Sequence, residues 1–470
     1  MKKSVAWVSL ILVLAVMFGF AYIMQNGVDE AGSGAVKNTK LGLDLAGGRG
    51  KWGFDCAVLE GKIEDPFIKE DGKFREADYH EALMLVAKKM QIAKQVYGKD
   101  AVAVSVSDRY TNEEAYAIKE MADIIGAKTI CLNNRESGLK KVLGFDASPN
   151  TIDELLSTNL ILKIGFEDED NRVIALKMKQ AEEQGAKILD LTTSKNSIDF
   201  LKEIAKALLD AGMGKKLAGY AKFKASLKDV KVSKKAQDAA NEIMNAKKAM
   251  FVYQQNNITV EAATLVADLA LLSGHIGAPR DGILQVKSKN NSQGLIDLGI
   301  TEGAEALDGV KALFVFGENA KIDTKKLDFL AVCDTHLTDL AEKADVIIPG
   351  TGFASTNGTY TNTERRLLAV EKAVDEGIMF ANWEVAAEIA HYFEVDLPWD
   401  DTDDISEEMC DYVPAYKYAV IGEVTGNVLT PVKPALAVVE KGKLIDKLNV
   451  TDSLMQTIDD RLPKPANPTK

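Results

Sequence analysis

The chain has 470 residues, of which 46% are hydrophobic, and this is enough for a large core and for two or more domains. Its formal net charge of -13 argues against nucleic acid as a partner. The four cysteines, Cys56, Cys131, Cys333 and Cys410, are scattered without C-x-x-C spacing, so we expect no iron–sulfur cluster in this chain.

The N-terminus starts with Lys2 and Lys3 and continues with an almost wholly apolar run at residues 4–24, long enough to cross a bilayer as one helix. The run is long for a signal peptide and no clear cleavage site follows, so residues 1–26 are predicted to be a membrane anchor. A linker at 27–48 ends in LGLDLAGG. This front end resembles the protein-export translocase subunit SecD. The resemblance stops near Arg49, so we expect either a chimeric reading frame or a natural membrane-anchored variant.

From Trp52 onward, short β-rich runs alternate with helical patterns. Asp78 is expected to cap one helix, and Thr111 or Asn112 to cap another that reaches Gly126. The expected strands are 101–106, 128–132, 160–165, 186–191, 249–253, 312–316, 329–333 and 346–348, and further helices are expected at 171–184, 260–272 and 383–392. Strands that alternate with helices in this way predict parallel sheets with crossover helices.

Two polar loops follow expected strands. Residues 344–366 read ADVIIPGTGFASTNGTYTNTERR, a short apolar run and then a long Gly/Asn/Thr turn with a charged end. Residues 287–294 place several amide side chains before a helix, and amides can both donate to and accept from a ligand. Loops after the strands of an α/β protein are where ligands bind. The alternatives are an ordinary surface loop and a capped helix start.

These loops, together with SDRYTNEEAY at 107–116, resemble the molybdopterin oxidoreductase superfamily. That family includes formate dehydrogenase alpha subunits and the NuoG-type subunit of NADH-quinone oxidoreductase. The resemblance covers about residues 49–445, and Ser355 stands where the family pattern usually has Glu. It implies an α/β fold of two facing Rossmann-like parallel-sheet units, one inserted in the other. In the chain, these units follow the one transmembrane helix that is predicted near the N-terminus. The implied boundaries are 49–140 with 295–410 for the first unit, 141–294 for the second, and an irregular tail at 411–470.

The resemblance also implies a cofactor, molybdopterin guanine dinucleotide. The residues that match the family's binding motifs are Lys287, Asn290, Asn291, Gln293, Gly294, Gly317, Asn319, Gly358, Thr359, Asn362, Glu364 and Arg365. The family's metal-binding cysteine or selenocysteine follows an arginine, but here Arg135 is followed by Glu136 and Ser137. No metal ligand is therefore predicted, Ser137 is the alternative, and catalytic residues stay unassigned. Binding of molybdenum or tungsten is left open.

By resemblance, the chain is a subunit of an electron-transfer complex of the formate dehydrogenase or NADH-quinone oxidoreductase type, without its iron–sulfur part. Its expected partners are iron–sulfur and NADH-oxidising subunits. One alternative is a non-catalytic structural subunit or fragment without bound metal. Another, which rests on the front end alone, is a membrane-anchored export component. Residues 4–24 predict membrane attachment, whereas the subunits that the body resembles work in the cytoplasm.

Overall fold

The structure is a computed structural model, and it describes residues 62–132, 137–191, 197–425, 428–439 and 450–451. These residues belong to one compact unit that runs from Leu59 to Met455. The predicted anchor at 1–26, the linker at 27–48 and the junction near Arg49 lie outside the described residues. Within the described ranges, no helix has both the length and the apolar character that a bilayer crossing needs.

The larger of two main sheets has seven strands, and we call it the large sheet. Its strands, in spatial order, are β2 (Lys73–Glu76), β1 (Phe67–Glu70), β12 (Val346–Pro349), β11 (Phe329–Asp334), β9 (Ala312–Phe316), β3 (Val102–Val106) and β4 (Lys128–Ile130). The five strands from β12 to β4 are parallel, and β1 pairs antiparallel with β12 and with β2. The parallel strands are short and almost fully buried, as expected for strands that are covered on both faces.

The second main sheet, the small sheet, has four parallel strands. Their order is β6 (Lys187–Asp190), β5 (Leu160–Ile164), β7 (Ala249–Gln254) and β8 (Gly282–Val286). All four strands fall between β4 and β9 along the chain. The prediction of an α/β fold with parallel sheets is confirmed. Two short antiparallel pairs complete the described strands: β13 (Gly358–Thr361) with β14 (Leu367–Val370), and β10 (Asn319–Ala320) with β15 (Val450–Thr451).

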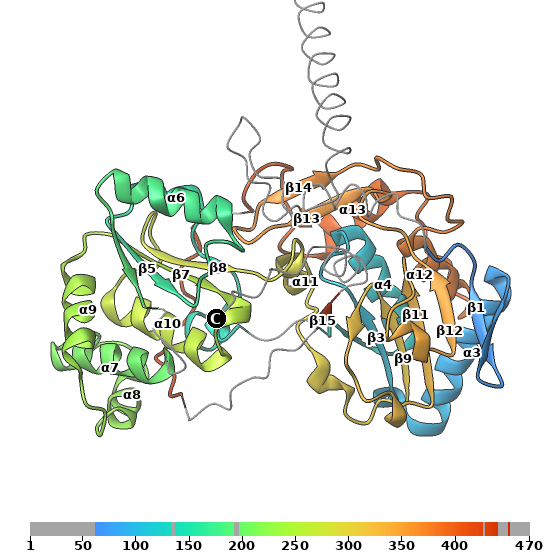
Figure 1. Ribbon diagram of the computed structural model, residues 1–470, viewed down its shortest axis with the longest axis horizontal. Helices are drawn as coiled ribbons and strands as arrows, with labels where there is room; N and C mark the ends of the chain where they lie inside the picture. The colour runs from blue at the N-terminus through green and yellow to red at the C-terminus, as the bar shows by residue number, and fades with distance from the viewer. Residues whose placement is uncertain (1–61, 133–136, 192–196, 426–427, 440–449, 452–470) are drawn as a thin grey trace, which may run out of the picture. The chain divides into compact units, whose positions relative to one another are not determined.

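Helices cover one face of the large sheet (Figure 1). They are α3 (Tyr79–Tyr97), α4 (Asn112–Ile125), α12 (Asn382–His391) and α13 (Thr402–Tyr412). The other face packs against short turns that include Ala304–Leu307 and Ala341–Lys343. One face of the small sheet packs against α5 (Leu139–Leu143), α7 (Ser197–Asp210), α8 (Tyr220–Ser226), α9 (Lys234–Asn245) and α10 (Val260–Ser273), and the opposite face packs against α6 (Arg172–Glu183). One further short helix, α11 (Ser292–Asp297), follows β8.

The helix starts show how local sequence produces these elements. Thr111 caps α4 with a complete capping box, because its side chain accepts from the Glu114 N–H while the Glu114 carboxylate accepts from the Thr111 N–H. Asp78 caps α3 by accepting from the Glu81 N–H at 2.7 Å. The Glu81 carboxylate binds Arg75 at 2.5 Å instead of returning to the cap. Both predicted caps are confirmed.

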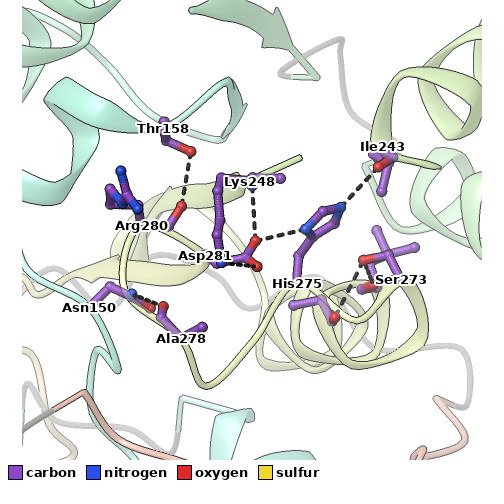
Figure 2. A network of polar contacts seen from close by, with 12 residues as sticks. Asn150, Thr158, Ile243, Lys248, Ser273, His275, Ala278, Arg280 and Asp281 are labelled. Carbon is purple, nitrogen blue, oxygen red and sulfur yellow. Dashed lines mark hydrogen bonds and ion pairs between the residues drawn. The ribbon is translucent and has the colours of Figure 1, made fainter. Parts of the chain in front are cut away.

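A buried ion pair closes the edge of the small sheet where the strands begin. The Asp281 carboxylate accepts from His275 Nδ1 at 2.7 Å and lies 3.2 Å from Lys248 Nζ (Figure 2). It also accepts from the Ala249 N–H at 3.0 Å, so it joins the starts of β7 and β8. His275 Nε2 lies 2.9 Å from the Ile243 carbonyl oxygen. Because both ring nitrogens face acceptors, the imidazole is held as the doubly protonated cation.

The pKa values follow from this geometry. Burial by itself would lower the pKa of His275, but the hydrogen bonds to Asp281 and to the Ile243 carbonyl raise it above its ordinary value. Burial would raise the pKa of Asp281, but the bond to His275 holds it below its usual range. Since the folded-state pKa of His275 is raised, its stabilising contribution is complete below about pH 6.5 and is lost as the pH rises through the folded-state value.

We therefore expect the melting temperature of the wild-type chain to exceed that of His275→Gln most strongly at pH 6, and this difference to shrink as the pH rises. The measurement is a thermal melt of both proteins at a series of pH values. Groups that titrate in both proteins cancel in the difference, so the comparison isolates this pair. A difference that stays constant or grows with pH would contradict the assignment of a protonated imidazole.

Candidate functional site

The candidate site lies at the carboxyl ends of the parallel strands. In the large sheet, β4 lies on one side of β3, while β9, β11 and β12 lie on the other side, so the winding reverses between β3 and β9. In open α/β sheets this reversal point is where ligands bind. Residues 107–110 follow β3, and residues 317–319 follow β9. Two of the predicted binding residues, Gly317 and Asn319, are therefore at this point.

Gly317 and Asn319 both make close contacts within the protein. Gly317 has a φ of +67°, and a Cβ there would lie 2.5 Å from Cε1 of Tyr110, so only glycine fits beneath this ring. Asn319 is buried, and its Oδ1 accepts from the Leu340 N–H at 3.2 Å. Between them, the buried Glu318 carboxylate accepts from the Leu132 N–H at 3.1 Å. This turn is thus anchored by the protein itself.

The predicted loop at 287–294 is hydrogen-bonded to the loop that follows β3. Asn290 Nδ2 donates to the Arg109 carbonyl at 3.2 Å, and Asn291 Nδ2 donates to the Tyr110 carbonyl at 2.8 Å. Asn291 Oδ1 also accepts from the Thr361 N–H at 2.8 Å. Asn291 is buried, whereas Asn290 is exposed. The structure therefore brings both asparagines together with the loop after β3, and it brings Asn291 to the β13–β14 hairpin.

Lys287 forms a buried ion pair. Its Nζ lies 3.1 Å from Asp146 Oδ1, and the two side chains are 0% and 8% exposed. Asp146 Oδ2 accepts from the Ser137 N–H at 3.1 Å. Burial alone would raise the pKa of Asp146, but Lys287 and the Ser137 bonds hold it below its ordinary value. The pair is therefore ionised, and it fixes the segment before β5 to the segment after β8.

The start of the β13–β14 hairpin is pinned by the start of α4. Glu113 Oε2 accepts from the Thr359 N–H at 2.6 Å, and Glu113 Oε1 accepts from the Thr359 hydroxyl at 2.8 Å. Gly358 has a φ of +136°, and a Cβ there would collide with Glu113 Oε2. Asn112 Nδ2 donates to the Thr359 hydroxyl at 3.0 Å. Gly294 leaves room for the Asn112 amide, because a Cβ at 294 would strike its oxygen.

The turn of the same hairpin is bound to the segment before β5. Asn362 Oδ1 accepts from the Glu364 N–H at 3.0 Å and so shapes the turn. The buried Glu364 carboxylate accepts from the Ile152 N–H at 2.7 Å. Arg365, with a φ of +65°, donates from Nε to the Ser148 carbonyl at 2.9 Å. The predicted hairpin residues thus hold the chain around 148–152 in place.

Two carboxyl groups at the α4 start are almost completely buried. Burial raises the pKa of both Glu113 and Glu114 above the ordinary value, against the hydrogen bonds that each one accepts. Glu114 Oε1 accepts from the Thr356 hydroxyl at 3.0 Å and from Asn382 Nδ2 at 2.8 Å. Besides the capping bond from Thr111 to Glu114, the donors around both carboxyls come from segments far away in the sequence, so these two groups join those segments to the start of α4.

Sequence reasoning missed Asp146, Glu113 and Ser148 as partners of the predicted residues. Glu113 belongs to the TNEE run that carried part of the resemblance, and that run could have pointed to it. Asp146 and Ser148 stand in GFDASPN, which has no motif. Their partners lie more than 130 positions away in the chain, so spacing could not reveal them.

Ser137, the alternative metal ligand, is buried and its hydroxyl accepts from the Leu139 N–H at 3.2 Å. The neighbouring Arg135 and Glu136 lie outside the described residues. In the described part of the chain, no group of three or more His, Cys, Asp or Glu side chains is arranged to hold a metal ion. The role of Ser137 as a ligand stays a prediction.

Two buried glutamines have amide atoms without a hydrogen-bond partner among the described residues. Gln285 is fully buried, and neither its amide nitrogen nor its amide oxygen has a partner among the described residues. Gln293 Nε2 donates to Asp297 at 2.8 Å, but the buried Gln293 Oε1 has no partner in the described ranges. Buried amides normally find partners. An unpartnered amide can donate to and accept from a ligand, whereas Lys287 and Arg365 are already bonded to protein atoms.

Comparison with known proteins agrees with this architecture. The family model described as "Molybdopterin oxidoreductase" matches residues 62–392. Acetylene hydratase from Pelobacter acetylenicus has a similar fold, with a TM-score of 0.59 and 14% identity, over 80% of this chain and 70% of that chain. At this identity the likeness shows the fold alone.

Two curated relatives are similar over most of the chain. "Probable oxidoreductase YjgC" of Bacillus subtilis is 26% identical over 463 residues, which cover 78% of this chain and 47% of that protein. "F420-dependent formate dehydrogenase 2 subunit alpha" of Methanococcus maripaludis is 26% identical over 466 residues, which cover 78% of this chain and 68% of that protein. The chain thus spans about half the length of the first relative and about two thirds of the second. With the family model matching well over half of its residues, this chain belongs to the molybdopterin oxidoreductase family.

Proposed function

We propose that this chain is a subunit of a formate-dehydrogenase-type electron-transfer complex in which it has a structural role and does not hold the molybdopterin cofactor by itself. The observation that carries the proposal is the buried Lys287–Asp146 ion pair. The relatives named as formate dehydrogenase alpha subunits support the type of complex. Its proposed partners are subunits that carry iron–sulfur clusters, with NADH-oxidising subunits as the expectation that comes from the resemblance alone.

The two cations among the predicted cofactor residues, Lys287 and Arg365, are the reason for proposing a structural role. A cofactor with phosphate groups is bound by charged donors such as Lys and Arg. Lys287 is fully buried and paired with Asp146. Arg365 donates to the carbonyls of Ser148 and Thr425, and its side chain is buried too. Both cations are buried and bonded to protein groups, so this arrangement does not fit a phosphate without rearrangement, and we derive no reaction step through the cofactor.

A second candidate function, binding of molybdopterin guanine dinucleotide, is favoured by one observation. The amide atoms of Gln285 and Gln293 that lack partners among the described residues suit a pterin or guanine edge. When bound in such a protein, this group supplies two-electron redox chemistry. The residues of this chain that would hold its rings are Gln285 and Gln293, with Asn290 at the exposed side. The predicted export function and membrane attachment rest on residues 1–48, outside the described ranges, and stay predictions.

The first test measures pterin and metal. The full chain is produced in a host that makes molybdopterin, with molybdate or tungstate supplied, and is purified in a folded state. We expect oxidised-pterin fluorescence and elemental mass spectrometry to find far less than one pterin and one metal atom per chain. A known molybdopterin enzyme from the same host serves as the loading control. Near-stoichiometric pterin would reject the structural role and support the second candidate.

The second test concerns the Lys287–Asp146 pair. Lys287→Met leaves the buried Asp146 carboxylate without its cation, and this should cost about 3–5 kcal/mol of unfolding free energy. Adding Asp146→Asn removes the buried charge and keeps an acceptor for the Ser137 N–H, so the double variant should recover most of the loss. Urea unfolding of both proteins measures these changes.

The matched control for this test is Lys140→Met on α5, where the lysine is exposed. It should change the unfolding free energy by less than about 0.5 kcal/mol. If Lys287→Met has an effect as small as the control, Lys287 is not a structural cation and is available for a ligand. That outcome would overturn the argument for the structural role, independently of how much pterin is found.

A further inference from the structure

An extended segment of the C-terminal chain, which we call the strap (residues 428–439), lies across the helices of the small sheet. Its backbone N–H groups donate to carbonyls of that region: Leu429 to Pro149 at 3.2 Å, Val432 to Leu143 at 2.8 Å, Ala435 to Val142 at 3.2 Å and Leu436 to Ala218 at 2.9 Å. Leu436 is 6% exposed and belongs to the apolar core on this side of the sheet. The strap is therefore held by its main chain along most of its length.

Glycines beneath the strap allow its backbone to come close. Gly144 has a φ of +85°, and a Cβ there would lie 2.5 Å from the Val432 carbonyl oxygen. Gly219 has a φ of +78°, and a Cβ there would collide with the Leu436 carbonyl oxygen. Any side chain at either position would push the strap away, and both positions have backbone conformations that favour glycine. The surface under the strap is thus shaped for an extended chain.

The end of the strap is held by a buried carboxyl group. Asp268 lies in the middle of α10, is 0% exposed, and accepts from the Ala437 N–H with Oδ1 at 2.9 Å. Its Oδ2 is also buried and has no partner in the described ranges of the chain. An ionised carboxylate with one hydrogen bond in an apolar setting is strongly disfavoured relative to the neutral acid.

We propose that the strap is a pH-sensitive latch, which stays closed over α10 while Asp268 is protonated and opens locally when Asp268 loses its proton. The ionised group needs water or further donors, and it can gain them when the chain around Ala437 lifts off. The proposal does not depend on the structural role proposed above, because it concerns the contact between Asp268 and Ala437 and no predicted cofactor residue is part of that contact.

The electrostatic surroundings of Asp268 agree with the geometry. Burial raises the pKa of Asp268 to about 8, and the Ala437 N–H opposes the rise. The charged residues on the packed helices are Lys140 and Lys141 on α5, Glu261 on α10, and Asp199, Lys202, Glu203, Lys206 and Asp210 on α7. Because the folded-state pKa is raised, the contribution of this group to strap closure is present at low pH and is lost as the pH rises through about 8.

The test is hydrogen–deuterium exchange of the full chain between pH 6.5 and 9.5, read by mass spectrometry and corrected for the intrinsic exchange rate. In the wild type, we expect protection of the strap amides to fall by roughly tenfold or more between pH 6.5 and 8 and to level off above about pH 8, because only the closed state keeps the proton in the lower range. Amides of β7 report on global unfolding and should keep their protection. In Asp268→Asn, which cannot ionise, strap protection should not change with pH.

Constant protection in the wild type, or the same fall in Asp268→Asn, would overturn the proposal. A second pair of variants applies if Asp268→Asn does not fold. Gly219→Ala should lower strap protection already at pH 7, because its methyl group strikes the Leu436 carbonyl. Gly274→Ala is the matched control, with a φ of +82° and no atom within 4 Å of the added methyl. Equal strap protection in both alanine variants would show that the close approach does not hold the strap.

Discussion

Buried polar groups need hydrogen-bond partners, and this requirement organises the loops at the carboxyl ends of the strands. Asn291 satisfies a carbonyl after β3 and an N–H of the β13–β14 hairpin with one side chain. Glu113 holds the start of that hairpin, and Arg365 holds the chain around Ser148. Each contact joins segments that are far apart in sequence. If one of these groups were removed, its partner would remain buried without a bond, so the loops depend on each other.

The same residue types can serve a cofactor or a loop, which is why a motif match is not by itself a binding site. An asparagine amide that could bond a heterocycle can equally bond two backbone groups, and here Asn291 does the latter. A lysine that could pair with a phosphate can pair with Asp146. In this chain, donors of the predicted cofactor residues bind protein groups.

Local sequence rules predicted the elements well, because caps and strand runs are short-range features. The Thr111 cap of α4 was predicted and is confirmed, and β9 has its expected bounds at Ala312–Phe316. The prediction of one long turn at 350–366 was less accurate, since Gly358–Thr361 pairs with Leu367–Val370 as a hairpin. Sequence could not show that Lys287 pairs with Asp146, because that partner is set by tertiary packing across 141 positions. The assignment of the twelve residues to a cofactor stays a prediction.

The order of strands along the chain determines how long β3 waits for its neighbour β9 during synthesis. The large sheet places β9 directly beside β3, yet β4 ends at Ile130 and β9 begins at Ala312, so roughly 180 residues must leave the ribosome between them. At about 5–20 residues per second this takes on the order of 10–40 s. During that time β3 has no β9 beside it, while the strands of the small sheet emerge one after another. The nascent chain therefore carries one edge of β3, which reads VAVSV, without a hydrogen-bond partner, and such an edge can pair with another chain.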